Sequence, residues 1–352
     1  MLLQVTHETR YDYQPAVETA QHVAYLEPRP HAGQRVLSHS LLISPQPVQR
    51  RASDVYGNRR CFFSLQVPHS VLEVRARSLL STQAHALPES ALPWEQLRDS
   101  LRYQAGAAYQ PANEMVFASP FVPRQLEFAG YARPSFVAGA DVLTVARDLM
   151  ERIHTDFTYE THSTQINTPA LQALEQRKGV CQDFAHIMLA CWRSMGLPAR
   201  YVSGYLLTQP PPGQTKLIGS DASHAWVSVY VPDLPEGARW VDLDPTNNRW
   251  GWHAPGVDYV TVATGRDFGD VSPLRGVIHG GSRHTLSVGV TVEEIRDDLE
   301  TPAPLPTDNQ APAPPDMRQT QSQSQSQSQS QSQSQSQSQS QSQSSGSLLQ
   351  NP

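Results

Sequence analysis

Residues 179–186 (GVCQDFAH) are the most informative part of this 352-residue chain, together with two later fragments. The later fragments are residues 223–226 (SHAW) and 240–247 (WVDLDPTN). A cysteine that begins a helix, followed by a histidine and an aspartate on strands, is the usual arrangement for catalysis by a nucleophilic thiol. The three fragments therefore predict a thiol site.

The helix predicted after Gly179 should be central and buried. Its apolar residues occupy two neighbouring faces, and Gly196-Leu197-Pro198 ends it. Three strands are expected downstream, at residues 199–206, 224–231 and 239–244. A helix packed on an antiparallel sheet would place Cys181 at the helix N-terminus, where unpaired N–H groups and the helix dipole stabilise a thiolate.

The alternation of side chains along the strands brings a carboxylate to the histidine. If the second and third strands are antiparallel neighbours, His224 lies opposite the far end of the third strand, which carries Asp242 and Asp244. Both aspartates point to the same face. The pattern alone therefore leaves both as candidates for the residue that orients His224.

The motifs resemble those of the bacterial transglutaminase-like superfamily. The resemblance rests on residues 177–186, on the continuation at 196–205 and on the histidine and aspartate fragments. It implies an α+β fold with a papain-like core, and Cys181, His224 and Asp244 as catalytic residues, because the family's acid precedes a Pro-Thr-Asn-type turn. It also implies a thioester formed from a carboxamide or peptide carbonyl. An amine would resolve the thioester by transamidation, and water would resolve it as in an amidase or cysteine protease.

The groups that would stabilise the oxyanion are less defined. The backbone N–H of Cys181 is the first expected donor. The tryptophan that animal transglutaminases use upstream of the cysteine has no counterpart, since no tryptophan lies between Trp94 and Trp192. Gln182 and Tyr159 are therefore the candidates for a second donor. Asp242 and Trp226 are expected to support the catalytic histidine from behind, with Trp226 also packing beside the cleft.

Four regions are expected along the chain. Residues 1–80 read as short strands and resemble the N-terminal β domain of bacterial transglutaminase-like proteins, with Asp54 and the Gly57-Asn58 turn as shared features. Residues 81–138 are expected to be a connector, and residues 139–295 the catalytic core. Residues 296–352 contain a proline-rich stretch and a Gln-Ser repeat, which predict a disordered tail.

Composition excludes several classes of function. The net charge is −6 with interspersed signs, so we expect no nucleic-acid partner. No signal peptide or apolar span is visible, and three cysteines suit a reducing compartment, so a cytoplasmic location is expected. Histidine and cysteine spacing predicts no metal site, no EF-hand loop is present, and the predicted chemistry needs no cofactor. A protein or peptide substrate is expected, and the sequence does not indicate the oligomeric state.

Two other functions are compatible with the same sequence. A scaffold or binding protein of this fold would need no turnover, although the intact Cys181, His224 and Asp244 set argues against it. A docking role could instead use the N-terminal β module and the Gln-Ser tail, although variable repeat length without function is the simpler interpretation of the tail.

Overall fold

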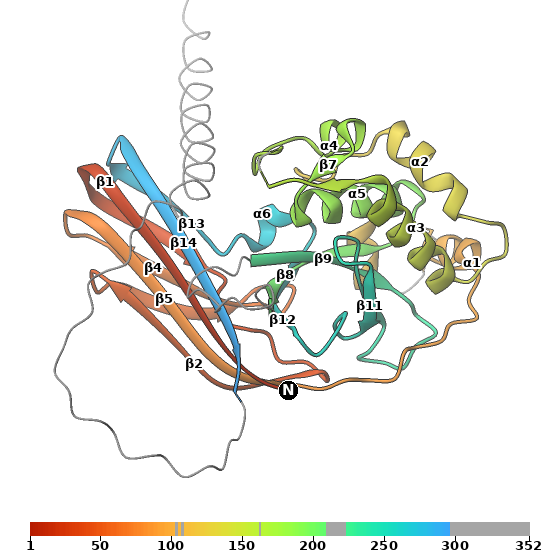
Figure 1. Cartoon of the computed structure of the whole chain (residues 1–352), viewed down its shortest axis with the longest axis horizontal. Helices are drawn as coiled ribbons and strands as arrows, with labels where there is room; N and C mark the ends of the chain where they lie inside the picture. Colours follow the sequence, from red (N-terminus) through yellow and green to blue (C-terminus); the bar gives the residue numbers. More distant parts are fainter. Residues whose placement is uncertain (103–104, 107–108, 162, 209–222, 296–352) are drawn as a thin grey trace, which may run out of the picture.

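The computed structural model describes residues 1–102, 105–106, 109–161, 163–208 and 223–295. The chain forms an α+β structure in which a strand-rich region lies beside a mixed core of helices and sheet (Figure 1). The expected fold class is confirmed. The tail predicted at residues 296–352 lies outside the described residues.

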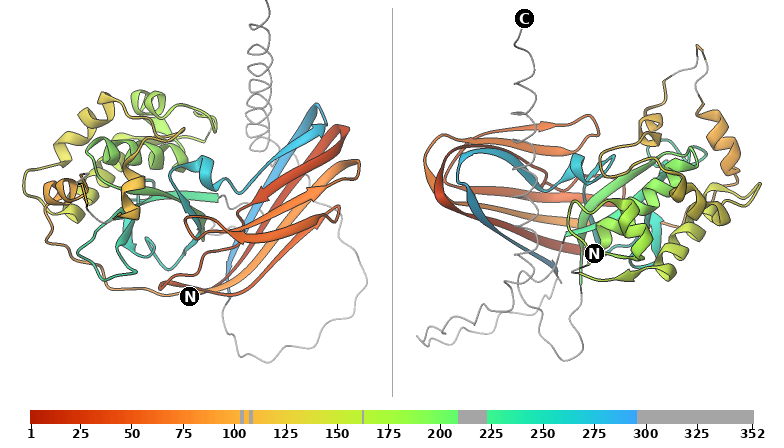
Figure 2. Two further views of the ribbon diagram at one scale, coloured as in Figure 1. Left: turned by 180° about the vertical axis from the view of Figure 1, so that it is seen from behind. Right: turned by 90° about the horizontal axis from the view of Figure 1, so that it is seen from above.

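One long strand organises the strand-rich region. The first half of β1 (Leu2–Ala24) pairs with β5 (His69–Thr82) on one side and with β14 (Arg283–Glu294) on the other. Its second half pairs in the same way with β4 (Arg59–Leu65) and β13 (Leu274–Gly280). The two outer strands are β2 (Gln34–Ser44), on β5, and β3 (Val48–Ser53), on β4. Because both halves share β1, the sheet bends along that strand into the curl seen in Figure 2.

The concave side of this bent sheet carries its own hydrophobic core. Buried side chains alternate along β1 and β5 with exposed ones, as a sheet with one solvated face requires. The core includes Tyr11, Phe63, Leu72 and Leu286, which come from four different strands. The expectation of a β-rich N-terminal region is therefore confirmed, but its sheet is completed by the far end of the chain.

That completion corrects the expected division of the chain. The catalytic core was expected to extend to residue 295, yet β13 and β14 pair with β1 in the N-terminal sheet. Strands more than 250 residues away in sequence from their partner leave no local pattern that identifies the pairing. Residues 274–294 therefore belong structurally to the strand-rich region, while their sequence follows the core.

The core contains a five-stranded antiparallel sheet in the order β11-β10-β9-β8-β12. Its strands are β8 (Ala199–Leu206), β9 (Ser223–Tyr230), β10 (Trp240–Asp244), β11 (Arg249–Trp252) and β12 (Tyr259–Gly265). The central helix α5 (Cys181–Ser194) packs against β8 and β9. The other helices are α1 (Trp94–Ser100), α2 (Leu126–Ala132), α3 (Val142–Asp156), α4 (Ala170–Gln176) and α6 (Phe268–Val271). Short elements complete the core: the 3-10 turns η1 (Pro111–Val116) and η2 (Arg133–Ser135), and the parallel pair β6 (Thr158–Tyr159) and β7 (Lys178–Gly179).

Helix α5 is buried on nearly every side. Every residue from Asp183 to Arg193 is buried, and Trp192 is fully so. The expected connector, residues 81–138, contributes to this core, because Trp94, Phe128 and Phe136 lie in the same hydrophobic cluster as α5. A helix enclosed by packing on all sides holds its first turn, and hence Cys181, in a fixed place.

Two buried amide side chains join the strand-rich region to the core. Gln34 donates to the carbonyl oxygens of Arg29 and Thr261 and accepts from the N–H of Thr261 on β12. Asn58 bonds both the N–H and the C=O of Thr264 on the same strand. The Gly57-Asn58 turn thus joins the N-terminal sheet to the edge strand of the five-stranded core sheet. None of the helices in the described ranges is long and apolar enough to span a bilayer.

Candidate active site

Cys181 is the first residue of α5, and its neighbour Asp183 fixes that end of the helix. The Asp183 carboxylate accepts a hydrogen bond from the N–H of Val180 at 2.8 Å and another from the hydroxyl of Thr164 at 2.6 Å. Val180 is extended and precedes the helix, so the bond closes the first turn as a capping residue at the third helical position does. The thiol of Cys181 is partly exposed, whereas Cys61 and Cys191 are buried.

His224 and Asp244 form a buried pair beside Cys181. Nε2 of His224, on β9, lies 2.7 Å from Oδ2 of Asp244 at the end of β10, and Asp244 is fully buried. Burial by itself lowers the pKa of His224, but hydrogen bonds with Asp244 and with the Cys181 side chain outweigh burial and raise the pKa to about 10. The imidazole is therefore held in its cationic form between a carboxylate and a thiol.

The structure distinguishes the two aspartates that the sequence left open. Asp242 and Asp244 point to the same face of β10, as expected, but only Asp244 contacts His224. Asp242 instead accepts a hydrogen bond of 2.9 Å from the indole N–H of Trp226. The centroid of the Trp226 ring lies 6.0 Å from that of the His224 ring, and the supporting role expected for Asp242 and Trp226 stays a prediction.

Two residues that were not predicted complete the environment of Asp244. The Asn247 side-chain amide donates to Oδ2 at 2.7 Å, and the Tyr259 hydroxyl donates to the same oxygen at 2.7 Å. Burial raises the pKa of Asp244, but the bonds from His224, Asn247 and Tyr259 reverse this and lower it. The carboxylate is therefore held ionised. Asn247 belongs to the Pro-Thr-Asn turn that follows Asp244 in the sequence. No sequence pattern indicated Tyr259, because its strand reaches the site only through the order of strands in the folded sheet.

The two candidates for the second oxyanion donor, Gln182 and Tyr159, differ in how they are placed in the structure. The Gln182 side chain donates to the carbonyl of Ile166 at 2.9 Å, so part of its amide is already used. Tyr159 is half-exposed and lines the same cavity as Cys181. Burial, followed by the nearby Cys181, Asp183 and Asp244, raises the pKa of Tyr159 to about 12. Its hydroxyl thus stays protonated at neutral pH and able to donate.

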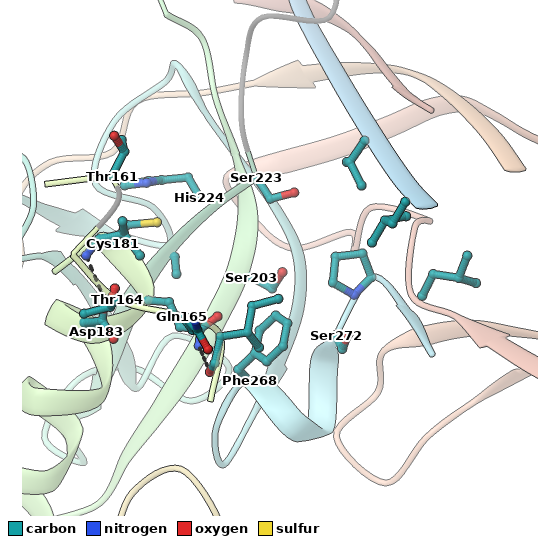
Figure 3. A pocket seen from close by; sticks show the side chains of 18 of the residues that line it. Thr161, Thr164, Gln165, Cys181, Asp183, Ser203, Ser223, His224, Phe268 and Ser272 are labelled. Carbon is teal, nitrogen blue, oxygen red and sulfur yellow. Dashed lines mark hydrogen bonds between the residues drawn. The ribbon is translucent and has the colours of Figure 1, made fainter. Parts of the chain in front are cut away.

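A cavity of about 310 Å³ extends from Cys181 and His224 toward the N-terminal sheet. Cys181 and His224 lie together on one side of it, and Ser272 lies away from them (Figure 3). The wall remote from Cys181 is built from His7, Thr9 and Tyr11 of β1 and from Leu286 and Val288 of β14. The cavity volume falls within the range of about 300–1,000 Å³ common for ligand sites.

The wall that β1 contributes was also missed from the sequence. Nδ1 of His7 lies 2.9 Å from the hydroxyl of Tyr205 on β8, and Nε2 lies 3.1 Å from the hydroxyl of Thr9. Burial lowers the pKa of His7 to about 4, so this histidine is neutral at physiological pH. The alternation along residues 3–11 could have shown which face of the strand is buried, but not that this face meets the site.

Comparison with known proteins agrees with this geometry. A family described as "Bacterial transglutaminase-like N-terminal region" matches residues 3–81, and the "Transglutaminase-like superfamily" matches residues 131–245. The uncharacterized protein Rv2569c of Mycobacterium tuberculosis is 40% identical over 301 residues, which cover 83% of this chain and 91% of that protein. The chain belongs to the transglutaminase-like superfamily.

More distant similarities extend the comparison. A protein-glutamine gamma-glutamyltransferase of Pseudomonas aeruginosa is 30% identical over 135 residues, which cover 35% of this chain and 20% of that enzyme. The crystal structure of a candidate cysteine protease from Cytophaga hutchinsonii superposes with a TM-score of 0.61 at 18% identity, covering 88% of this chain and 94% of that one. This superposition shows that the two proteins share a fold.

Other residues of this transglutaminase-like core are structural. His186, one turn after Cys181, is buried against Phe121 and Tyr201, and its Nε2 accepts a hydrogen bond from the N–H of Phe268 at 3.3 Å. Burial lowers the pKa of His186 to about 3, so it packs as a neutral ring. Across the described ranges, no group of three or more histidine, cysteine, aspartate and glutamate side chains is arranged to hold a metal ion.

Proposed function

We propose that this protein is a cysteine-dependent acyl-transfer enzyme that attacks a carboxamide or peptide carbonyl through Cys181. The proposal is carried by one observation: His224 is hydrogen-bonded to the buried carboxylate of Asp244 and lies beside the partly exposed Cys181 on one side of a cavity. A thiolate is the reactive form of cysteine, and a neighbouring imidazolium stabilises it. Membership of the transglutaminase-like superfamily supports the reaction class.

In the first step, Sγ of Cys181 would add to the carbonyl carbon of the substrate. The imidazolium of His224 then donates its proton to the leaving nitrogen as the carbon–nitrogen bond breaks, which releases ammonia or an amine. The acyl group remains on Cys181 as a thioester. Asp244 keeps the ring of His224 oriented and offsets its positive charge throughout.

One backbone donor and one side-chain donor would stabilise the oxyanion formed in this step. The first N–H groups of a helix have no acceptor within the helix, so that of Cys181 is suited to the role. The Tyr159 hydroxyl is our choice for the second donor, because the Gln182 amide already donates to Ile166.

In the second step, an acceptor would attack the thioester while neutral His224 removes its proton. A primary amine gives a new amide and transamidation, and water gives a free carboxylate. The Pseudomonas aeruginosa relative, a protein-glutamine gamma-glutamyltransferase, supports the amine as acceptor and a protein or peptide as acyl donor. Three free cysteines support a cytoplasmic location as part of the same proposal.

Alkylation by iodoacetamide between pH 5 and 9 tests the proposal. We expect Cys181 to react well below the pH at which ordinary thiols do, and His224→Ala to abolish this early reactivity. His279→Ala is the matched control, because His279 is exposed on β13 with its ring paired only to Glu18 at 3.4 Å. Background should be low, since Cys61 and Cys191 are buried.

A substrate screen should follow on the same protein. Ammonia release from glutamine-containing peptides, measured with and without a primary amine, separates transamidation from hydrolysis. Ordinary thiol reactivity at Cys181 in both the wild type and His224→Ala would contradict the proposal. It would instead favour a scaffold or binding protein that retains the fold without turnover.

A further inference from the structure

Apart from the site residues Cys181, His224 and Asp183, the cavity is lined by uncharged groups. Among the described residues, no lysine, arginine or glutamate lines it. The one carboxylate in the lining, Asp183, is already bonded to the Val180 N–H and the Thr164 hydroxyl. His7 is neutral because burial lowers its pKa to about 4. Such a cavity favours an uncharged substrate, since a charged side chain would lose its hydration without gaining a partner.

The lining nevertheless offers many hydrogen-bonding groups. Hydroxyls are distributed around it, among them those of Thr9, Thr161, Ser203 and Ser272, together with the side-chain amides of Gln165 and Gln182. Apolar surface separates them, contributed by Ile166, Phe268, Pro273, Leu274, Leu286 and Val288. A substrate that is neutral yet rich in amide and hydroxyl groups matches this mixture.

The chain itself carries a segment of that chemistry. Residues 321–344 consist of twelve consecutive Gln-Ser pairs without a single charged residue. Each glutamine presents a primary carboxamide, the group that Cys181 attacks under the proposed function. The repeat thus combines the reacting group with the polarity of the cavity.

The repeat is also within reach. Val288 lines the cavity, and Ile295 follows it by seven residue-to-residue steps, a distance of about 24 Å at the usual rise of a strand. The 25 residues from 296 to 320 lie between Ile295 and the repeat, and a chain of that length can span at most about 85 Å. This span exceeds the strand distance more than threefold, which leaves length for a path around the N-terminal sheet.

We propose that the glutamines of residues 321–344 are acyl donors for Cys181 of the same chain. This inference rests on the proposed function. Sγ of Cys181 attacks the side-chain carbonyl of a repeat glutamine, the carbon–nitrogen bond breaks, and ammonia leaves with the proton from His224. A primary amine then takes the acyl group and restores the thiol, or water does so and leaves a glutamate in the repeat.

Few amines of the chain itself can compete with an added acceptor. Only two lysines occur in the sequence, Lys178 and Lys216, among 27 lysines and arginines. Lys178 pairs with Glu160 at 2.9 Å. In the absence of an added amine, the expected product is therefore deamidated repeat, and crosslinking between copies should be minor.

Incorporation of monodansylcadaverine into the full-length protein tests the inference. Trypsin should release the whole repeat in one peptide, because no lysine or arginine follows Arg318. We expect dansyl label on repeat glutamines in this peptide, and none in Cys181→Ala. The rate per molecule should not depend on protein concentration, because donor and thiol belong to one chain.

Gln→Asn at all twelve repeat positions is the matched variant. It keeps the repeat neutral and of the same length but shortens each carboxamide arm by one methylene, so label should be lost from residues 321–344. Early iodoacetamide reactivity of Cys181 should be unchanged in this variant, which shows that the thiol site is intact.

Three other outcomes would overturn the inference in different ways. If Cys181 reacts early and an added glutamine peptide takes up the dansyl amine while the repeat does not, the proposed function stands and the repeat is no substrate. If the labelling rate per molecule rises in proportion to protein concentration, the donor comes from another copy and the intramolecular assignment is wrong. If neither repeat nor peptide is labelled and Cys181 has ordinary reactivity, the proposed function fails, and this inference fails with it.

Discussion

The hydroxyl of Tyr259 donates a hydrogen bond of 2.7 Å to Oδ2 of Asp244, the same oxygen that binds His224. The two donors come from different strands of one sheet, since Tyr259 lies on the edge strand β12 and His224 on the central strand β9. The guanidinium of Arg249 lies 4.8 Å from the Tyr259 ring and is itself bound in bidentate fashion by Asp258. The orientation of Asp244 is thus set by side chains well outside the motif that contains it.

Tyr259→Phe should lower the free energy of unfolding by about 1.5–3 kcal/mol, because it removes a buried hydrogen bond to an ionised group. Tyr205→Phe is the matched control: its hydroxyl bonds the neutral ring of His7, so we expect a loss of about 1 kcal/mol. Urea unfolding of both variants checks this. Equal losses would show that the bond to Asp244 has no special strength.

The pH dependence of stability should carry a contribution from His22. This ring stacks on Phe63, and neither of its nitrogens has a hydrogen-bond partner among the residues that the structure describes. Burial, with a smaller effect from His69, lowers the pKa of His22 to about 4. Between about pH 6.5 and pH 4, His22 is therefore protonated in the unfolded chain but stays neutral in the folded chain. The free energy of unfolding then falls as the pH falls.

His22→Phe should remove that contribution. The slope of unfolding free energy against pH should decrease by up to about 1.4 kcal/mol per pH unit in this window. Urea unfolding at pH 7, 6 and 5 measures it. His279→Phe is the control, because His279 is exposed and its slope should stay as in the wild type. An unchanged slope in His22→Phe would mean that His22 is protonated in the folded state.

Substitutions at Asp183 should separate helix capping from charge. Asp183→Ala removes the acceptor of the Val180 N–H and should cost about 1 kcal/mol of stability. Asp183→Asn keeps an oxygen for that bond but removes a negative charge beside Cys181, so iodoacetamide should react faster at pH 6. Thr164→Val, which removes only the other hydrogen bond of Asp183, serves as control. Slower alkylation in Asp183→Asn would contradict this account.

Gly204 is expected to tolerate no side chain. It faces His224 across the β8–β9 pair, and an added Cβ would lie 2.1 Å from the carbonyl oxygen of Val260 and 2.5 Å from the Trp226 ring. Gly204→Ala should therefore cost about 2–3 kcal/mol through overpacking and should displace the ring behind His224. Thermal unfolding and the pH profile of alkylation report these two effects.

Gly130→Ala is the matched control for that substitution. Gly130 lies within α2, and an added Cβ would meet nothing within 4 Å. Alanine has the higher helix propensity, so a gain of up to about 1 kcal/mol is expected. Similar losses at both positions would show that the close approach at Gly204 is relieved by small shifts of the sheet.

The sequence predicted the parts of the site that local patterns encode. The apolar helix after Gly179 and the alternation along residues 224–231 were sufficient to predict α5 and β9, and with them the positions of Cys181 and His224. The choice between Asp242 and Asp244 needed a family turn motif. Residues that are two positions apart on a strand point to the same face, so periodicity cannot distinguish Asp242 from Asp244.

What the sequence could not provide depends on contacts between distant segments. Tyr259 reaches Asp244 only because β12 lies next to β8 in the sheet order. His7 and Val288 line the cavity only because β1 and β14 pair across nearly the full described length of the chain. Neither pairing leaves a local signature, because each partner strand reads as an ordinary half-buried strand.

The return of β14 to β1 has a consequence for biosynthesis. The N-terminal sheet can begin to form early on the ribosome, but one edge of β1 stays unpaired until residues 274–294 have left the exit tunnel. The cavity wall that contains Leu286 and Val288 is thus made late, after every other element that lines the cavity. A nascent chain therefore has its cysteine, histidine and aspartate long before it has an enclosed chamber around them, and a premature stop before β13 would release the reactive set without that enclosure.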